Sequence, residues 1–288
     1  MVLDSVDNDA ATRRQAGVYL HLTSLPGSYG IGEIGAAARA FIDTMRRMEL
    51  SVWQFLPLGP TAYGDSPYQP LSTFAGNEML VDIADLVDLG LLSEEEVEEL
   101  TTLPDRYVDY GSLIPIKNRL LRLAASRFDE IVGEDILSDF KGFLDRNDDD
   151  WLHDYAVFRI LKTRHGERPW PEWQPEFVQR EPAALARLEA SEGDRIRAIK
   201  VIQYLFFRQW WMLRDYAHAK GVTLFGDMPI CIALDSSDAW ANREILRLDE
   251  NGKPDHVAGV PPDYFSEDGQ LWGNPLYDWD QHAANGYQ

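Results

Sequence analysis

Two short apolar runs and one helical stripe define the start of the chain. Residues 17–22 form an apolar run that predicts a strand, and the turn-rich residues 23–32 follow it as a loop. Helical spacing then recurs as far as about Glu49, and the stripe consists of Ile34, Ala38, Phe41, Met45 and Met48. Residues 52–57 predict a second buried strand. Strand, helix and strand in this order form a βαβ unit, whose two strands run parallel.

A long irregular segment separates this unit from a helical region. Residues 59–77 contain three prolines and three glycines and predict an ordered loop, which is a frequent location of function. Residues 83–143 are helical and acidic in pattern, and Ser93 before EEEVEEL predicts a capped helix. The run DRNDDD at 145–150 is a solvated loop or helix start. Two further helices are predicted by the stripes Trp151, Tyr155, Phe158 and Ile199, Ile202, Phe206, Trp210, Leu213, Ala217.

A third buried strand, residues 222–225, breaks at Gly226 and presents Asp227 at its end. The predicted fold is therefore α/β, with about three parallel strands and a large helical insertion. We divide the chain into a polar arm at 1–15, an α/β part at 16–77 and 196–288, and a mostly helical insertion at 78–195. Because parallel strands point their carboxyl ends the same way, the loops after all three strands are expected on one face.

Composition narrows the possible partners. The chain is 45% hydrophobic and carries a net charge of −21, with 48 Asp plus Glu against 27 Lys plus Arg. A surface this acidic repels nucleic acid and anionic membranes, so we expect neither as a partner. Two explanations of this charge stay open. The acidic surface suits a protein that must stay soluble at high salt, and it is also compatible with an ordinary acidic cytosolic protein. The single cysteine, Cys231, excludes an internal disulfide, and no export signal or membrane span is indicated, so a cytoplasmic location is expected.

The loop after the second strand offers the first candidate binding residues. Tyr63, Ser66 and Tyr68 suit a sugar, because aromatic rings pack on its C–H face while hydroxyl and carboxylate groups bind its hydroxyls. A tight turn with a packed tyrosine is the other interpretation, and the residues alone do not decide between them.

The strand-end carboxylate Asp227 offers the second. It is placed to hold substrate hydroxyls, to act as acid or base, or to cap the next turn. Further along, Pro261 and Pro262 stiffen a loop that displays candidate contacts at Asp263, Phe265 and Trp272.

Several other chemistries lack support in the sequence. No phosphate-binding, dinucleotide-binding or serine-hydrolase motif is present. His21 has no second histidine or cysteine at metal-ligand spacing, and Cys231 is interpreted as a small buried side chain. We therefore expect no metal and no cofactor.

Four long motifs resemble the 4-α-glucanotransferases, also called amylomaltases or disproportionating enzymes, which are relatives of the α-amylases. The motifs are AGVYLHLTSLPGSYGIGEIG, QFLPLGPTAYGDSPYQPLSTFAGN, GVTLFGDMPI and AGVPPDYFSEDGQLWGNPLYDWD, and the resemblance covers residues 17–279. It implies a (β/α)8 barrel with helical insertions. It also implies transfer of α-1,4-glucan segments to glucose or glucan acceptors by a retaining double-displacement mechanism.

The resemblance assigns sugar contacts by motif position. Tyr63, Ser66 and Tyr68 resemble the donor-side contacts, and Asp227 resembles the barrel carboxylate that holds glucose hydroxyls. The remaining implied contacts lie in and beside a mobile loop over the glucan, at Asp263, Phe265, Trp272 and Asn274.

The resemblance also implies what is missing. The family's nucleophilic Asp, acid/base Glu and third Asp follow the PPDYF motif on later strands, so they are expected beyond Gln288 and no catalytic residue is assigned here. Three of eight strands do not close a barrel. We expect an N-terminal part of a halophilic 4-α-glucanotransferase that is inactive alone. A non-catalytic α-glucan-binding protein and a partial barrel completed by another chain stay open as alternatives.

Overall fold

The computed structural model describes residues 14–61 and 66–287, and its centre is a small parallel sheet. The strands are β1 (Gly17–Tyr19), β2 (Val52–Gln54) and β3 (Thr223–Phe225), in the order β1-β2-β3. Val18 pairs with Trp53, and Trp53 pairs with Leu224, both in parallel register. The helix α1 (Ala36–Arg47) joins β1 to β2. The predicted parallel βαβ unit is confirmed, as is the third strand, each strand being shorter than expected.

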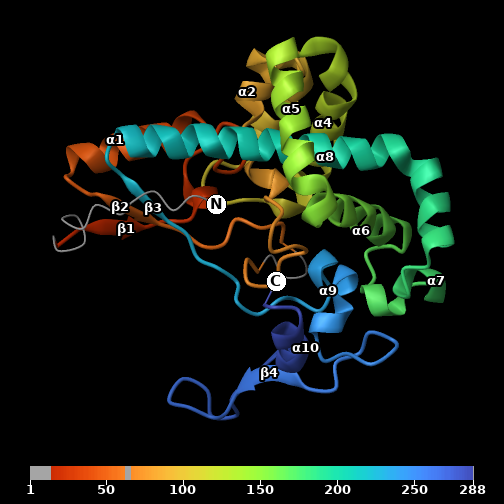
Figure 1. The fold of residues 1–288 in the computed structure, drawn as a ribbon. Helices are drawn as coiled ribbons and strands as arrows, with labels where there is room; N and C mark the ends of the chain where they lie inside the picture. The colour runs from red at the N-terminus through yellow and green to blue at the C-terminus, as the bar shows by residue number, and fades with distance from the viewer. Residues whose placement is uncertain (1–13, 62–65, 288) are drawn as a thin grey trace.

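One face of the sheet is covered by helices. Side chains alternate between the two faces of a strand, so Val18, Trp53 and Leu224 share this face, and Trp53 is fully buried. The ring of Phe41 on α1 meets Trp53 edge-on, with centroids 4.9 Å apart. The long helix α8 (Pro182–Ala219) crosses the same face, as Figure 1 shows. These contacts fix the sheet against α1 and α8.

The opposite face of the sheet is open to solvent. Tyr19, Gln54 and Phe225 lie on this face, in a shallow concavity of about 550 Å³. Phe225 is 56% exposed, and Thr223 is exposed as well. The prediction of a buried third strand was therefore wrong for this face, because no described residue packs against it. Within the described residues, β1 and β3 each pair with β2 alone.

The helical part of the chain follows the long loop and packs as a group of helices beside the sheet (Figure 1). The Ser93 prediction is confirmed: its side chain and that of Glu96 form a reciprocal capping box. Residues 145–150 form the end of one helix and the start of the next. The elements are η4 (Glu78–Leu80), α2 (Ile83–Asp88), α3 (Glu94–Val97), η5 (Glu98–Thr102), α4 (Tyr110–Ile131), α5 (Glu134–Asn147), η6 (Asp148–Leu152), α6 (His153–Arg164), η7 (Trp170–Glu172) and α7 (Pro175–Val178).

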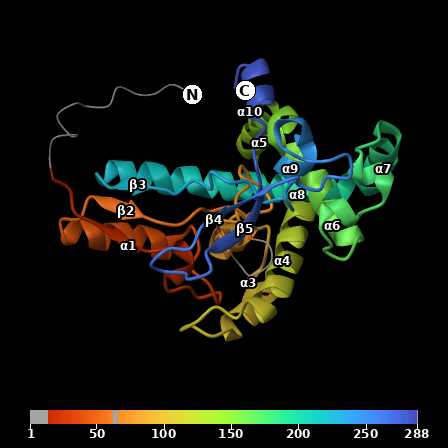
Figure 2. The ribbon, with the colours of Figure 1, turned by 90° about the horizontal axis from the view of Figure 1, so that it is seen from below.

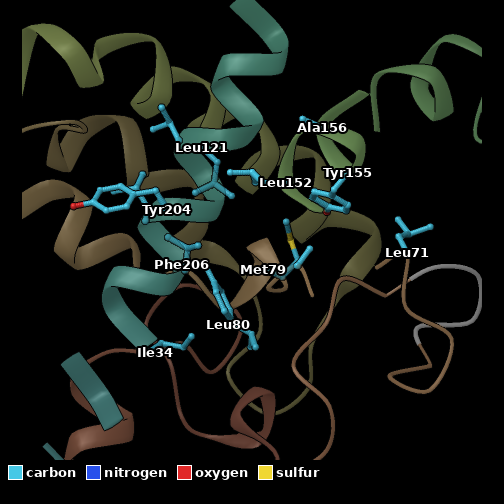
Figure 3. Close-up of a cluster of buried hydrophobic side chains, with 14 of the residues drawn as sticks. Ile34, Leu71, Met79, Leu80, Leu121, Leu152, Tyr155, Ala156, Tyr204 and Phe206 are labelled. Carbon is cyan, nitrogen blue, oxygen red and sulfur yellow. The ribbon is translucent and has the colours of Figure 1, made fainter. Parts of the chain in front are cut away.

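The helix α8 (Pro182–Ala219) links the helical part to the sheet. It is 38 residues long and crosses position 195, where we divided the chain. Gln203 on α8 binds the backbone of Gly76 at both its N–H and its C=O. Around this helix lies a shared core, in which Tyr204 and Phe206 of α8 approach residues of the helical part (Figure 3). The division at 78–195 stays a prediction.

The last segment contains structure that the sequence analysis did not predict. After α9 (Ser237–Ala241) and η8 (Arg243–Ile245), strands β4 (Val257–Val260) and β5 (Gln270–Pro275) form an antiparallel hairpin. Figure 1 shows this hairpin away from the three-stranded sheet, and Figure 2 shows α10 (Trp279–Ala284) at some distance from the hairpin. Trp272 lies in β5, so its assignment to a loop was wrong. In the part of the chain that the structure describes, no helix combines the length and the apolar character needed to cross a membrane.

Candidate functional site

A cleft of about 700 Å³ opens where the loops after β2 and β3 meet the hairpin. The loop after β2 contributes Ser66, Tyr68 and Gln69, and the segment after β3 contributes residues 227–231. Strand β5 closes one side. The segments meet here because β2 and β3 are neighbours and run parallel, so their carboxyl ends lie together. The described lining consists of Ser66, Tyr68, Gln69, Asp227, Met228, Pro229, Ile230, Cys231, Leu271, Trp272 and Asn274.

Tyr68 and Asp227 form the polar centre of the cleft. The hydroxyl of Tyr68 donates a hydrogen bond of 2.8 Å to Oδ2 of Asp227. This bond raises the pKa of Tyr68 above its ordinary value, and partial burial and the negative charge of Asp227 act in the same direction. Both side chains are exposed, so Oδ1 of Asp227 is accessible to a ligand hydroxyl. The residues that the sequence placed on separate loops are thus adjacent.

The hairpin is fastened to the cleft at two levels. Near its tip, the Gln69 side chain donates to the backbone oxygen of Trp272 at 3.1 Å, while the Trp272 indole donates to Gln270. At its base, the buried amide of Asn274 donates to the backbone oxygens of Cys231 and Ile232, at 3.3 and 2.8 Å. Asn274 therefore lines the cleft and also anchors the hairpin.

Asp263 and Phe265 lie in the loop between β4 and β5, outside the described lining of the cleft. Oδ1 of Asp263 accepts the backbone N–H groups of Phe265 and Ser266, each at 2.9 Å. The Ser266 hydroxyl closes the same turn onto the backbone oxygen of Gly269. Tyr264 and Phe265 project from this turn and are 98% and 91% exposed. The Asp263 carboxylate shapes the loop that presents these two rings.

Six residues of the lining were not predicted from the sequence. Gln69 stood in the loop already singled out, and its position beside Tyr68 was the available signal. Apolar residues directly after the strand-end Asp227 were a second signal. The prediction that Cys231 is buried was wrong, because it is half-buried with a free thiol. Tyr63 lies outside the described residues. The residues not predicted are Gln69, Met228, Pro229, Ile230, Cys231 and Leu271.

The chemistry of the cleft suits a neutral polyol. Its walls are largely apolar and aromatic, and hydrogen-bonding groups gather at Ser66, Tyr68 and Asp227. Among the described lining residues, Asp227 is the one carboxylate. No group of three or more His, Cys, Asp or Glu side chains in residues 14–61 and 66–287 is arranged to hold a metal ion.

Comparison with known proteins gives a consistent result. A sequence model of the family described as 4-alpha-glucanotransferase matches residues 20–288. The 4-alpha-glucanotransferase of Thermus thermophilus is 44% identical over 274 residues, which is 95% of this chain and 54% of that protein. The chloroplastic/amyloplastic 4-alpha-glucanotransferase of Solanum tuberosum is 41% identical over 285 residues, covering 97% and 49%.

A solved structure extends the likeness to three dimensions. The amylomaltase from Streptococcus agalactiae, determined in complex with acarbose, has a TM-score of 0.90 and 38% identity, and the match covers 96% of this chain and 55% of that one. The chain thus spans about half the length of the curated relatives that it matches.

Proposed function

The chain belongs to the 4-alpha-glucanotransferase family, and we propose that its cleft is the donor-side part of a site for α-1,4-glucans. The observation that carries this proposal is the Tyr68–Asp227 pair in an apolar, aromatic-walled cleft. A glucose unit packs its C–H face on such walls, and its hydroxyls bind Asp227 and Ser66. The members named above are glucanotransferases, which supports a retaining transfer to glucose or glucan acceptors as the activity of the whole protein.

We propose further that the 288-residue chain binds glucan without transferring it. A retaining transfer requires two carboxyl groups about 5 Å apart on either side of the scissile bond. Asp227 lines the cleft, whereas Asp263 lies outside the described lining and uses one oxygen for its own turn. The described residues therefore provide binding contacts without the catalytic pair. This arrangement is also compatible with the alternative function, that of a non-catalytic glucan-binding protein.

The open face of the sheet supports the proposal that a further polypeptide segment completes the fold. Tyr19, Gln54 and Phe225 leave a concavity on that face, and the outer edges of β1 and β3 have no strand partner among the described residues. We propose a (β/α)8 barrel whose remaining strands cover this face, supplied by a further polypeptide segment. A native mass above that of the monomer, measured by light scattering, would support a separate completing chain.

Two measurements on the purified chain test the function. Calorimetric titration with maltoheptaose is expected to show binding that Asp227→Asn weakens about tenfold, because the ligand hydroxyls lose a charged acceptor. Incubation with maltotriose is expected to give neither free glucose nor longer glucans. Absence of maltoheptaose binding contradicts the site, while disproportionation of maltotriose contradicts the proposal that the chain binds without transferring.

A further inference from the structure

A second cavity lies between α4, α6 and α8, and it shares no lining residue with the cleft. Its volume is about 370 Å³, which falls within the range of ligand pockets. The wall from α4 includes Asn118 and Ser126, and that from α8 includes Ile199 and Ile202. We call this space the interhelical cavity.

One buried polar atom in its lining has no hydrogen-bond partner among the described residues. Oε1 of Glu78 accepts a long bond of 3.4 Å from Arg159, while Oε2 is buried and has no partner among the described residues. Tyr155 is 1% exposed as a residue and lines the same cavity. An unmet buried polar atom costs about 1–3 kcal/mol, so such groups generally face a ligand or water.

The neighbouring glutamine behaves differently. Gln203 also lines the cavity, but both atoms of its amide are bound to Gly76, at 2.8 and 2.9 Å. Among the described lining residues, the buried atom without a partner is thus Oε2 of Glu78, and Tyr155 and the guanidinium of Arg159 line the same space. They present an acceptor, a hydroxyl and a donor toward one space.

Charge selects the class of ligand. The lining carries three positive and three negative side chains, so the interhelical cavity is neutral overall within a chain of net charge −21. Neither an anion nor a cation gains from that balance. The aliphatic part of the wall consists of Ile160, Ala198, Ile199 and Ile202. The six charged residues are Glu78, Arg122, Arg159, Glu167, Asp194 and Arg195.

We propose that the interhelical cavity binds a neutral sugar, one glucose or maltose molecule, independently of the cleft. Hydroxyls of the sugar donate to Oε2 of Glu78 and bind the Tyr155 hydroxyl and the Arg159 guanidinium. Its C–H face packs on the isoleucines of α6 and α8. The choice of an α-glucoside among neutral polyols rests on the proposed function.

Titration of the full chain with maltose, followed by amide chemical shifts and calorimetry, tests the proposal. In the unaltered chain, two separate groups of shifts are expected, one around residues 66–69 and 227–231 and the other around 118–126, 155–163 and 195–203. Asp227→Asn is expected to weaken the first and leave the second unchanged. Tyr155→Phe, Glu78→Gln and the space-filling Ala198→Phe are each expected to weaken the second at least tenfold.

A matched control is Tyr204→Phe, which removes the hydroxyl of another buried tyrosine that bonds Asp139 and lies outside the interhelical cavity. It is expected to leave maltose binding at both sites unchanged. If no shifts appear at 118–126 and 155–163 in the unaltered chain, or if Ala198→Phe leaves them unchanged, the proposal is overturned. Loss of the shifts at 66–69 and 227–231 alone would overturn the proposed function and leave this second site standing.

Discussion

The hydroxyl of Tyr68 lies 2.8 Å from Oδ2 of Asp227, although 159 positions separate the two residues along the chain. The parallel pairing of β2 with β3 brings them together, because each residue follows the carboxyl end of its strand. The whole helical part is inserted between them and leaves this contact intact. The bond therefore reports directly on whether the cleft is assembled.

The first prediction concerns the pKa of Tyr68. Asp227→Asn removes the charged acceptor that raises this pKa, so the pKa is expected to fall toward the ordinary value of a tyrosine. The measurement is an NMR pH titration of the tyrosine ring carbons. Tyr29, whose pKa is raised mainly by burial, is the internal control and is expected to titrate unchanged. An unchanged Tyr68 titration in the variant would show that the pair is not formed in solution.

The second prediction separates two roles of Asp263. Asp263→Asn keeps an acceptor oxygen for the backbone N–H groups of Phe265 and Ser266, whereas Asp263→Ala loses it. If the main role of Asp263 is to form this turn, the asparagine variant therefore preserves the turn and the alanine variant does not. We expect the alanine variant to exchange these two amide protons about tenfold faster, in keeping with about 1–1.5 kcal/mol. The asparagine variant is expected to stay close to the unaltered chain in exchange and in maltoheptaose affinity.

Asp268→Ala is the control for this comparison, since Asp268 lies in the same loop and its side chain forms no hydrogen bond with the described residues. Equal losses of affinity in Asp263→Asn and Asp263→Ala would instead assign Asp263 a direct contact with the glucan.

The parts of the fold that follow local periodicity were predictable. The stripe from Ile34 to Met48 gave α1, and Ser93 gave a capped helix, because each signal lies within a few residues. The hairpin β4–β5 was not recognised. Its strands are short and mostly exposed, and Pro261, Pro262 and the glycines around them are typical of loops.

Candidate residues at strand ends were predictable for a related reason. Asp227 stood out because it follows the carboxyl end of an apolar strand, which is where parallel α/β folds carry their sites. The double role of Asn274 was not predictable, since its bonds go to backbone oxygens 42 and 43 positions away. Cavities between helices, such as the one at Glu78 and Tyr155, depend on packing that no local pattern records.

The third prediction concerns the buried pair Glu33 and Lys117. Burial raises the pKa of Glu33 to about 7, although Lys117 opposes the shift. Between pH 4.5 and about 7, the Glu33 carboxyl therefore keeps its proton in the folded state and loses it in the unfolded state. The contribution of Glu33 to the free energy of unfolding consequently falls as pH rises through that window. Burial lowers the pKa of Lys117, because the charged ammonium is unfavourable in the interior. Glu33 opposes this shift, so the charge on Lys117 is less favourable still when Glu33 is removed.

Glu33→Gln is expected to change the free energy of unfolding little at pH 5.5, because the amide replaces a carboxyl that already carries its proton there. The variant is expected to become more stable than the unaltered chain between pH 5.5 and 8.5, since the unaltered chain loses stability with pH and the variant does not. Urea unfolding at both pH values measures the difference. The control Glu99→Gln removes an exposed pair with Arg119 and is expected to show a small cost at both pH values. A cost of Glu33→Gln that grows with pH contradicts the prediction.

The fourth prediction concerns salt. Residues 78–195 contain 28 Asp plus Glu against 14 Lys plus Arg, so two thirds of the net charge of −21 lies in the helical part. Repulsion within such a surface is screened over about 3 Å at 1 M salt, whereas exposed ion pairs lose little because they contribute little. The melting temperature is therefore expected to rise between 0.1 and about 2 M KCl, by about 2–4 °C for each kcal/mol of repulsion removed.

Replacing Glu94, Glu95 and Glu98 together by Gln removes three exposed charges that form no ion pair with the described residues. This variant should melt higher than the unaltered chain at 0.1 M KCl and respond less to added salt. The slope of melting temperature against log[KCl] measures both effects, and equal slopes for the two proteins would assign the salt response to something other than charge repulsion on this surface.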